Sequence, residues 1–558
     1  MINLKSSVML LLLSGSIAVS GVAGAVPASQ PEEGYSLTGL NNAGVQLNRM
    51  QDYLERQKVA RQISEARKSQ KAEVETNNKQ ETAQGQQVSF VLKQIKMAES
   101  AVLTKAEVDG SINEYLDKEV SIEDLYTIVD KINQLYSDKG YFTCKAILNS
   151  QTIKEGVVEL TLIEGRTGNI TVEGNRSTAA DYVQERVSLT EGEVDNINEL
   201  NKDLLLFNAT NNAQLRVSMQ AGQEPGTTDY VITTYEPQQH VWSLYEDNAG
   251  SKNTGEWRTG IFYNNRSLSG RRDNLALTTM FSCGTEMFSA NYSNHLNASG
   301  TMLNIGYSTN TVEIKKGEMK DLDVDGHAYS ASVGLVQPLK VTEELRTELG
   351  LSYNQQNSKT DFSGMDWVDD TIKDGNLYYS VTNYGDTSVF YRRHGITAGR
   401  SENILNKTRD YTLYQGNLLY QKAYKNRSVL NIRLDGQIAG NHYMPSSRQF
   451  YIGGAYSVRG YEESFLGGDH GYAASIEYSF PATAWDDKSD MFLFYDYGAV
   501  YGDSAFDDHI LSSVGLGLKT NITDKIYASV TVGFPLERHI NGTKVSKTRT
   551  HFMLNGQF

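Results

Sequence analysis

Cysteine is scarce in this chain, which has only two, Cys144 and Cys283, in regions that we assign below to different domains. An exported protein can form a disulfide between two such residues, because disulfides persist in oxidising compartments. Nothing in the sequence brings the two residues together. We therefore expect both cysteines to be unpaired and the fold to hold without a disulfide.

Long apolar runs are missing as well. Beyond residue 25 no stretch reaches the roughly 18 consecutive apolar residues of a transmembrane helix candidate, so the mature chain should have no spanning helix. Residues 1–25 have the features of a signal peptide: a cationic start at Lys5, an apolar segment over 8–18, and small residues before Val26. We expect cleavage before Val26, because the stop-transfer flank of a membrane anchor is absent.

Residues that carry catalysis or bind metals do not cluster in either of the two repeated modules over 88–165 and 166–238. Neither module has His, Cys or carboxylate groups at ligand spacing, and the chain has no Walker-type loop. Gly515-Leu516-Gly517 is a pair of strand glycines rather than a phosphate-binding loop. The net charge of −15 argues against a nucleic-acid partner. We expect no enzyme activity, no metal and no cofactor.

Tyrosine, by contrast, is abundant. The chain has 33 tyrosines with a mean hydropathy of −0.45, which suits a membrane β-barrel whose strands alternate apolar and polar faces. From residue 240 the sequence alternates in this way, for example over 345–353 and 526–534. Because a soluble β-sandwich would alternate too, the turns have to decide between the two folds.

The connections between the predicted strands alternate in length. We count sixteen strands over 241–558. Short polar connections follow even-numbered strands, at 267–273, 296–300, 340–344, 385–388, 422–427 and 521–524. Long connections follow odd-numbered strands, at 310–326, 357–375, 447–472 and 537–549. This pattern is typical of an outer-membrane barrel with periplasmic turns and external loops. The terminal aromatic Phe558 fits a membrane-targeting C-terminus at the membrane interface.

The predicted fold class is therefore an all-β membrane barrel of sixteen antiparallel strands, over 239–558, preceded by a helix and two α+β modules. The helix lies within 26–73, and its polar sequence over 43–73 has only a thin apolar stripe, Leu47, Met50, Leu54 and Val59. A structureless linker, 74–87, follows. A polar helix on a tether can dock and undock.

A β-α-α-β-β pattern occurs twice, over 88–165 and 166–238. The first copy has predicted strands at 88–97, 141–148 and 157–162 and helices at 105–116 and 121–136. The second has strands at 169–172, 213–219 and 229–234 and helices at 177–187 and 195–208. Ser121 and Asp124 form a capping box. Exposed sheet edges in such modules suit the capture of an extended polypeptide by strand addition.

The connection over 447–472 holds Val458-Arg459-Gly460-Tyr461 among six glycines. We predict that this loop, 441–471, folds into the barrel. Arg459 would then need a carboxylate, because an unpaired buried charge is costly. Asp496 is the candidate, since alternation places it opposite Tyr495 and Tyr497 and hence in the lumen. Gly460 would let the tip turn, and Tyr461 would pack it against the wall. The alternatives are a packed surface loop, or an Arg459 that contacts only lipopolysaccharide or solvent.

These motifs resemble the TpsB transporters of two-partner secretion, of the ShlB, FhaC and HecB type. The matching residues are Val458 to Tyr461, Phe494-Tyr495-Asp496-Tyr497-Gly498, Asp247-Asn248-Ala249-Gly250, Leu268-Ser269-Gly270 and Asp273. The resemblance covers essentially the whole mature chain. It implies a plug helix, two POTRA modules and a barrel, with Val458, Arg459, Gly460, Tyr461 and Asp496 as the loop lock. It also implies that Asp247, Asn248, Gly250, Phe494 and Gly498 form a structural motif.

The resemblance also implies a function. The chain would export one large partner, a haemolysin, adhesin or contact-dependent toxin, by receiving its unfolded N-terminal secretion domain on the POTRA modules. Folding outside the cell would supply direction without nucleotide. Further expected partners are outer-membrane lipid and, for biogenesis, periplasmic chaperones and the barrel-assembly machinery. Two alternatives stay open, a barrel-assembly factor and a passive porin.

Overall fold

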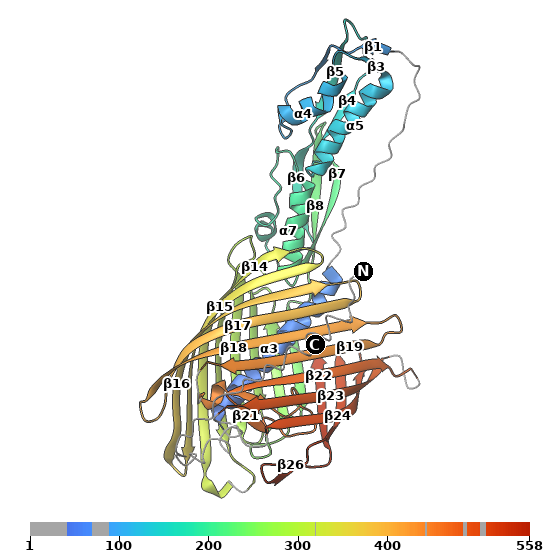
Figure 1. Cartoon of the computed structure of the whole chain (residues 1–558). Coiled ribbons are helices and arrows are strands. Elements are labelled where there is room, and N and C mark those ends of the chain that lie inside the picture. The colour runs from blue at the N-terminus through green and yellow to red at the C-terminus, as the bar shows by residue number, and fades with distance from the viewer. Residues whose placement is uncertain (1–41, 70–88, 318–319, 441–443, 484–487, 503–508) are drawn as a thin grey trace, which may run out of the picture.

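The structure, a computed structural model, describes residues 42–69, 89–317, 320–440, 444–483, 488–502 and 509–558. The predicted signal peptide, 1–25, and the predicted linker, 74–87, lie outside the described residues. Figure 1 shows a barrel with an arm of two small modules projecting from one end, and a helix inside the barrel. Within the described ranges, no helix is both long and apolar enough to cross a membrane.

The barrel is closed and consists of sixteen strands, each antiparallel to its neighbours, as predicted. The strands are β9 His240–Asp247, β10 Arg258–Asn265, β11 Asn274–Phe281, β12 Thr285–His295, β13 Met302–Glu313, β14 Val324–Val341, β15 Leu345–Phe362, β16 Met365–Tyr384, β17 Ser388–Glu402, β18 Thr408–Ala423, β19 Val429–Ala439, β22 His470–Pro481, β23 Ser489–Tyr501, β24 Ile510–Asn521, β25 Ile526–Pro535 and β28 Arg549–Gln557. The last strand pairs with the first, so both ends of the barrel sequence meet at one seam.

Alternation in these strands places apolar side chains outside and polar ones inside. On β23, Leu493 and Tyr495 are exposed on the outer face, whereas Asp496, which points to the opposite face, is fully buried. An outward apolar band is what a strand needs to face lipid. The fold is therefore a membrane barrel and not a soluble sandwich, as the alternating lengths of the connections predicted.

The prediction of a long loop over 357–375 is wrong. The strands β15 and β16 remain paired through most of this range, and only Ser363 and Gly364 form the turn, both with positive φ. The polar, carboxylate-rich sequence that suggested a loop belongs to a hairpin that extends beyond the other strands. Cross-strand pairs such as Lys359 and Asp366, 2.8 Å apart, stabilise this extension.

The loop between β19 and β22 does fold inward, and it contains a small hairpin, β20 Phe450–Ile452 with β21 Leu466–Gly468. The loop after β25 has its own short hairpin, β26 His539–Ile540 with β27 Thr543–Lys544. Ile452, Val458, Tyr461, Leu466 and Ile540 share one buried apolar cluster. The two loops therefore pack together instead of standing free.

The arm contains two sheets of three strands each, ordered β2-β5-β4 and β6-β8-β7. The first module has β1 Ser89–Val91, β2 Gln94–Lys96, α4 Lys105–Ile112, η1 Asn113–Tyr115, β3 Glu119–Ser121, α5 Ile122–Asp138, β4 Lys145–Leu148 and β5 Val157–Ile163. The second has β6 Arg166–Glu173, α6 Ala180–Gln184, α7 Ile197–Thr210, β7 Gln214–Ala221 and β8 Thr227–Tyr235. Strands β2, β4, β6 and β7 lie at sheet edges.

Two details of the first module differ from the prediction. The expected single strand over 88–97 is two short strands, because β1 pairs with the unpredicted β3 while β2 pairs with β5. The helix expected over 105–116 is α-helical only as far as Ile112. The capping box is confirmed: Ser121 Oγ accepts from the Asp124 amide, and the Asp124 carboxylate accepts from the Ser121 amide at 2.7 Å.

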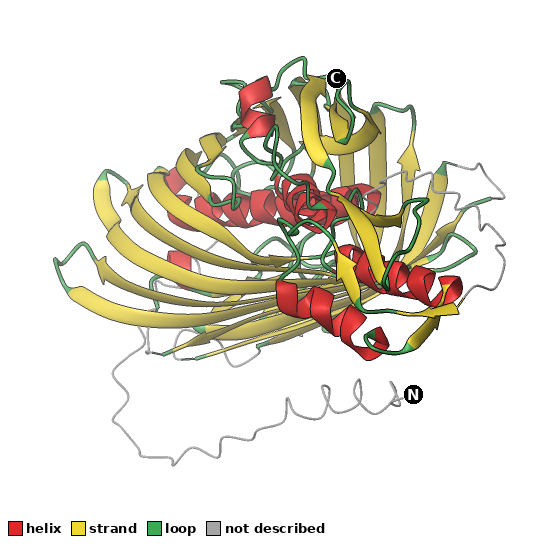
Figure 2. Ribbon diagram, turned by 90° about the horizontal axis from the view of Figure 1, so that it is seen from above, coloured by secondary structure: helices red, strands yellow, loops and turns green. Residues whose placement is uncertain are grey.

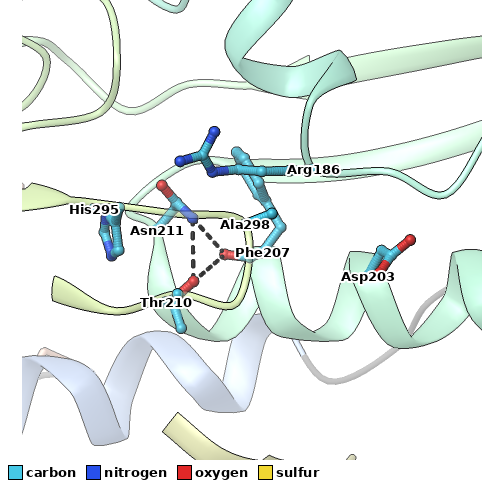
Figure 3. A pocket seen from close by; sticks show the side chains of 8 residues that line it. Arg186, Asp203, Phe207, Thr210, Asn211, His295 and Ala298 are labelled. Carbon is cyan, nitrogen blue, oxygen red and sulfur yellow. Dashed lines mark hydrogen bonds between the residues drawn. The ribbon is translucent and has the colours of Figure 1, made fainter. Parts of the chain in front are cut away.

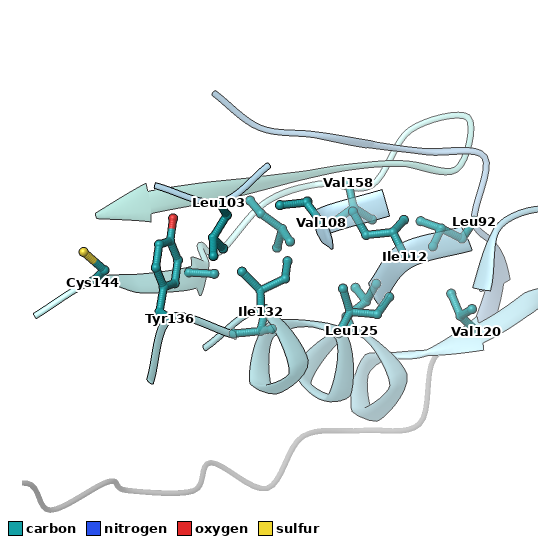
Figure 4. Close-up of a cluster of buried hydrophobic side chains, with 14 residues drawn as sticks. Leu92, Leu103, Val108, Ile112, Val120, Leu125, Ile132, Tyr136, Cys144 and Val158 are labelled. Atoms are coloured by element: carbon teal, nitrogen blue, oxygen red, sulfur yellow. The ribbon is translucent and has the colours of Figure 1, made fainter. Parts of the chain in front are cut away.

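Helix α5 packs its apolar face on the sheet of the first module (Figure 4). Its buried side chains Leu125, Ile128, Ile132 and Tyr136 meet residues from β4, β5 and α4 in one cluster. Cys144 lies at the edge of this cluster, where burial raises the pKa of its thiol to about 11. Cys144 and Cys283 are both free, as predicted.

The second module is docked on short turns at one end of the barrel. The Ala179 amide donates to Gly270 O at 2.8 Å, and Ser267 Oγ donates to Ser177 O at 2.6 Å. The buried Arg272 contacts Asn212, which extends this seam. A cavity of about 10 Å³ remains beside it, lined by Arg186, Phe207, His295 and their neighbours (Figure 3). It holds one water at most, so it is no substrate site.

Candidate functional site: a lock and a plug in the barrel lumen

Arg459 and Asp496 meet inside the barrel. Arg459 Nε donates to Asp496 Oδ2 at 2.7 Å and its Nη2 donates to Oδ1 at 2.9 Å, which is a bidentate pair. The backbone amide of Arg459 adds a third hydrogen bond to Oδ2 at 3.0 Å. Asp496 is 0% exposed. The contact between these two residues is as expected; their role in gating stays a prediction.

Three further side chains surround Arg459, and the sequence reasoning did not name them. Glu477 Oε2 accepts from Nη1 at 2.6 Å, Ser475 Oγ accepts from Nη2 at 3.1 Å, and Lys519 balances Glu477 at 2.5 Å. The signal was available, because Ser475 and Glu477 have the lumen-facing parity of β22. What the sequence lacked was the register that places Ser475 directly beside Asp496.

The ring of Phe494 lies against the guanidinium group of Arg459. The Arg459 guanidinium lies 3.5 Å from the centre of the Phe494 ring, within the range of a cation–π interaction. Gly498 lies four residues after Phe494 on β23, and a Cβ there would lie 2.9 Å from the Val458 side chain. The glycine therefore makes room for the loop tip. Val458 is 0% exposed.

The loop tip touches the backbone of β25. Gly460 has φ of +99°, which favours glycine, and an added Cβ would lie 3.1 Å from Pro535. Its partner Gly533 is equally restricted, because a Cβ there would lie 2.6 Å from the Gly460 nitrogen. Tyr461 is fully buried, and its hydroxyl lies 2.9 Å from Ser512 O and 2.9 Å from a Glu537 oxygen.

Helix α3, Ala43–Ser69, occupies the lumen beside the loop (Figures 1 and 2). It contacts β13, β14 and β15, and its Leu47 and Met50 are buried in a small apolar cluster with Tyr245. The thin stripe predicted for this helix is therefore matched by a small patch of wall.

The loop holds the helix from its other side. Arg49 forms a salt bridge with Glu463, which is 2% exposed. Arg56 Nη1 donates to Tyr456 O at 2.7 Å, and the Tyr456 ring packs 5.0 Å from Tyr53, centre to centre. One turn of chain between residues 453 and 464 thus carries the Arg459 lock and also contacts the helix.

Asp247 links the first barrel strand to the same turn. Arg258 binds its carboxylate with two nitrogens, at 2.8 and 2.5 Å, and the Tyr245 hydroxyl donates to it at 2.5 Å. The hydroxyls of Tyr245 and Tyr456 lie 2.8 Å apart. The backbone of Gly250 passes Gly255 so closely that a Cβ would come within 2.1 Å of its oxygen.

Asn248 and Phe558 close the seam between the last and first strands. The Asn248 side chain donates to Thr550 O at 2.8 Å and accepts from the Phe552 amide at 2.8 Å, so it prolongs the ladder beyond Asp247. At the opposite end, Phe558 exchanges two backbone hydrogen bonds with Trp242, at 2.8 and 3.0 Å.

The charged groups of the site are paired with one another. Among the residues that the structure describes, no group of three His, Cys, Asp or Glu side chains could hold a metal ion. Arg459, Lys519, Glu477 and Asp496 form a charge-balanced set.

Comparison with known proteins places this architecture. The family model for the haemolysin secretion/activation protein ShlB/FhaC/HecB matches residues 226–520, and that for the ShlB-type POTRA domain matches 90–165. The heme/hemopexin transporter protein HuxB of Haemophilus influenzae is 26% identical over 523 residues, covering 88% of this chain and 91% of HuxB. The outer membrane transporter CdiB of Dickeya dadantii is 26% identical over 204 residues, 36% of this chain and 33% of CdiB.

Among solved structures, CdiB from Escherichia coli superposes with a TM-score of 0.70 at 19% identity, covering 92% of this chain and 98% of CdiB. BamA from Haemophilus ducreyi, lacking POTRA domains 1–3, gives a TM-score of 0.52 at 14% identity, covering 84% and 100%. These two likenesses concern the fold alone. Since the family model matches more than half of the sequence, the chain belongs to the ShlB/FhaC/HecB family, as an outer-membrane transporter of two-partner secretion whose POTRA modules lie in the periplasm.

Proposed function

We propose that this protein exports one large partner polypeptide through its own barrel, with helix α3 as a plug that leaves during export and the Arg459 loop as a lock. The observation that carries the proposal is the filled lumen. Helix α3 contacts three strands, and its Arg49 and Arg56 bind groups of the loop. A barrel filled by a polar, separately tethered element can be emptied without unfolding its wall.

The contacts of the plug suit reversible docking. Its apolar contact with the wall is confined to one cluster around Leu47, Met50 and Tyr53. Its ion pairs can be exchanged for water. The pair between Arg49 and Glu463 has its arginine 31% exposed, and partly exposed pairs contribute little net stability. Release of the plug therefore mainly requires that this one apolar cluster be separated.

The two arm modules would receive the partner. Their sheets leave β2, β4, β6 and β7 as edges, and an unfolded chain can add a strand to such an edge through backbone hydrogen bonds. HuxB is named for heme and hemopexin and CdiB as an outer membrane transporter. We propose a secreted exoprotein of this general kind as the partner, with no enzymatic step. Chaperones and the assembly machinery remain expected partners in biogenesis.

The proposal is tested by secretion. In cells that lack this gene, the full chain should restore release of the exoprotein encoded beside it, and a chain without the first POTRA module should not, although its barrel still shifts on heated gels. Deletion of 26–87 should raise single-channel conductance in planar bilayers while secretion partly survives. Normal secretion without the first module would assign substrate entry elsewhere, and unchanged conductance would show that α3 is no plug.

A barrel-assembly factor is the second candidate, since the fold is shared with BamA. The structure offers one observation that bears on it. The seam between β28 and β9 has a short register, Met553↔Asp247 to Gln557↔Ser243. Asn248 and Phe558 extend it at both ends, however. A reinforced seam favours passage through the lumen over release between the strands.

A further inference from the structure

The outer faces of β16 and β17 are assigned by contacts that these strands make on their inner side. Asp374 on β16 forms an ion pair with the inward-folded loop at 2.7 Å, and a nitrogen of Arg393 on β17 lies 3.6 Å from a carboxylate oxygen of helix α3. Side chains alternate along a strand, so Lys373 and Arg400, which have the opposite parity, point outward. The Arg400 side chain is accordingly 65% exposed.

One row of paired residues crosses this outer face. Gln355 on β15 is opposite Lys373 on β16, and Lys373 is opposite Arg400 on β17. Arg400 is in turn opposite Asp410 on β18, whose carboxylate accepts two hydrogen bonds from it, at 2.6 and 3.1 Å. Among the described residues, Lys373 has no ion pair and the Gln355 side chain has no hydrogen bond. The row therefore has one unmatched positive charge, at Lys373.

The two cations of this row have N–H donors to spare. Arg400 uses its Nε and Nη2 for Asp410, and Lys373 has three donors on its ammonium group. Glu402, one row farther out and opposite Thr371, forms no ion pair with either cation in the described structure. Like charges directly opposite each other destabilise a sheet. An anion with several oxygens would accept from both side chains and remove this repulsion.

The height of the row on the barrel corresponds to a membrane boundary. Arg346 at the start of β15 donates to Ala209 O in the second arm module, so this end of the barrel is the periplasmic one. Phe390 lies near it on the outer face of β17, with its ring against Tyr420. From Phe390 to Arg400 the strand advances ten residues. At a rise of about 3.3 Å per residue and a tilt of about 40° this is a climb of about 25 Å, the height of the apolar band of a barrel.

The outward side chains between these two levels are apolar. Leu351, Leu377 and Ile396 are opposite one another on neighbouring strands and are 57%, 50% and 60% exposed. Such a surface faces lipid tails. The row of Lys373 and Arg400 lies four residues beyond Leu377 and Ile396, towards the end of the barrel away from the arm (Figure 1). Lysine and arginine suit this depth, because their stems lie along apolar surface while their charged heads reach the polar layer.

We propose that Gln355, Lys373 and Arg400 form a binding site for a phosphate group of lipopolysaccharide, the phosphorylated glycolipid in the outer leaflet of a bacterial outer membrane. Lys373 and Arg400 share the phosphate oxygens through charge-assisted hydrogen bonds, and Gln355 donates to a neighbouring sugar oxygen. The bound phosphate neutralises the unmatched charge of the row. The site faces the membrane and not the lumen, so it is independent of the proposed export.

Lipid binding to the purified full chain tests the site. Native mass spectrometry from detergent micelles measures the bound fraction in titrations with diphosphorylated lipid A, with dephosphorylated lipid A and with phosphatidylglycerol. Lys373→Gln and Arg400→Gln should each weaken binding of diphosphorylated lipid A about fivefold, and the double variant about thirtyfold, the factors expected for basic residues at an anionic surface. Binding of dephosphorylated lipid A should not change, and binding of phosphatidylglycerol, whose phosphate diester carries a single charge, should change less.

Arg392→Gln is the matched control. Arg392 lies on the same outer face of β17, over the Phe390 ring at the periplasmic level. Its replacement removes one positive charge without touching the row, so lipid A binding should equal that of the unaltered chain. The variants at Lys373 and Arg400 should keep the gel shift of a folded barrel on heating, because both side chains are exposed.

The outcomes decide between the possible occupants of the row. Unchanged binding of diphosphorylated lipid A in the double variant, or an equal loss in Arg392→Gln, would overturn the site. An equal loss for phosphatidylglycerol would overturn the assignment to the glycolipid, because the row would then bind anionic lipids in general. Reduced secretion of the exoprotein by the double variant, with lipid A binding intact, would assign the row to the exported chain and overturn the lipid site as well.

Discussion

Replacing Arg459 by alanine should destabilise the barrel by more than a surface ion pair could explain. Asp496 is fully buried and accepts four hydrogen bonds, from the Arg459 amide, Nε and Nη2 and from Ser475. The variant removes the two from the guanidinium and leaves the other two. Removing one partner of a buried pair costs about 3–5 kcal/mol, and the surviving bonds place this case near 3.

The reverse change, Asp496→Ala, should cost a similar amount. Arg459 would keep Glu477 at 2.6 Å and the Phe494 ring, and would lose its bidentate partner. The double variant strands neither charge of the pair. Its loss should fall short of the sum of the two single losses by about 2–3 kcal/mol, within the range for residues in direct contact.

The chain contains its own control. Arg400 and Asp410 form a pair of the same geometry, with distances of 2.6 and 3.1 Å, but their side chains are 65% and 71% exposed. The same cycle on this pair should give a coupling close to zero, because water screens exposed charges. The difference between the two couplings isolates the effect of burial.

Urea unfolding of the full chain in detergent micelles, followed by tryptophan fluorescence, measures the free energies. Secretion of the partner, measured for the same four chains, gives the functional cycle. If the two single losses add to within about 0.5 kcal/mol, Arg459 and Asp496 do not act on each other. The inward-folded lock would then be refuted.

Three further predictions follow from other contacts. Arg49→Ala should raise the resting single-channel conductance, because it releases the plug from Glu463. The control Lys252→Ala breaks the more exposed pair with Glu462 and should leave the conductance unchanged. Equal conductance in the two variants would show that other contacts hold the plug. Asn248→Ala should lower the unfolding free energy of the barrel by about 1–3 kcal/mol, because it removes two hydrogen bonds. The variant barrel should therefore lose its folded gel mobility at a lower heating temperature. An unchanged temperature would show that the seam does not depend on Asn248. The hydrogen bonds from Lys139 and Thr104 lower the pKa of Glu107 from 4.5 to about 2. The stability that this ionised carboxylate contributes to the first POTRA module is therefore present above pH 4.5 and is lost as the pH falls towards 2. Glu107→Gln should flatten this pH dependence in calorimetry of the full chain, and an unchanged pH profile would contradict the prediction.

The sequence alone was enough for the parts of this protein that depend on local pattern. Period-two alternation and the alternating lengths of the turns determined a barrel of sixteen strands, because each strand faces lipid on one side and the lumen on the other. The capping box at Ser121 and the parity of Asp496 are equally local. Short motifs such as Val458 to Tyr461 carry the resemblance to the family.

Local pattern failed where pairing with distant residues decides the structure. The hairpin over 357–375 has polar, loop-like residues, and its pairing is visible only in the register of β15 with β16. The strand expected over 88–97 is split because its two halves find different partners, β3 and β5. In both cases cross-strand contacts overrode local propensity.

The lumen shows the same division most clearly. Parity indicates that Glu477 and Ser475 face inward, but only the shear of the closed barrel brings them to the level of Arg459. The contact of Arg49 with Glu463 joins residues more than 400 positions apart. The position of a charged residue in a strand determines which face it occupies, since side chains alternate. The residue with which it pairs depends on how the whole barrel closes.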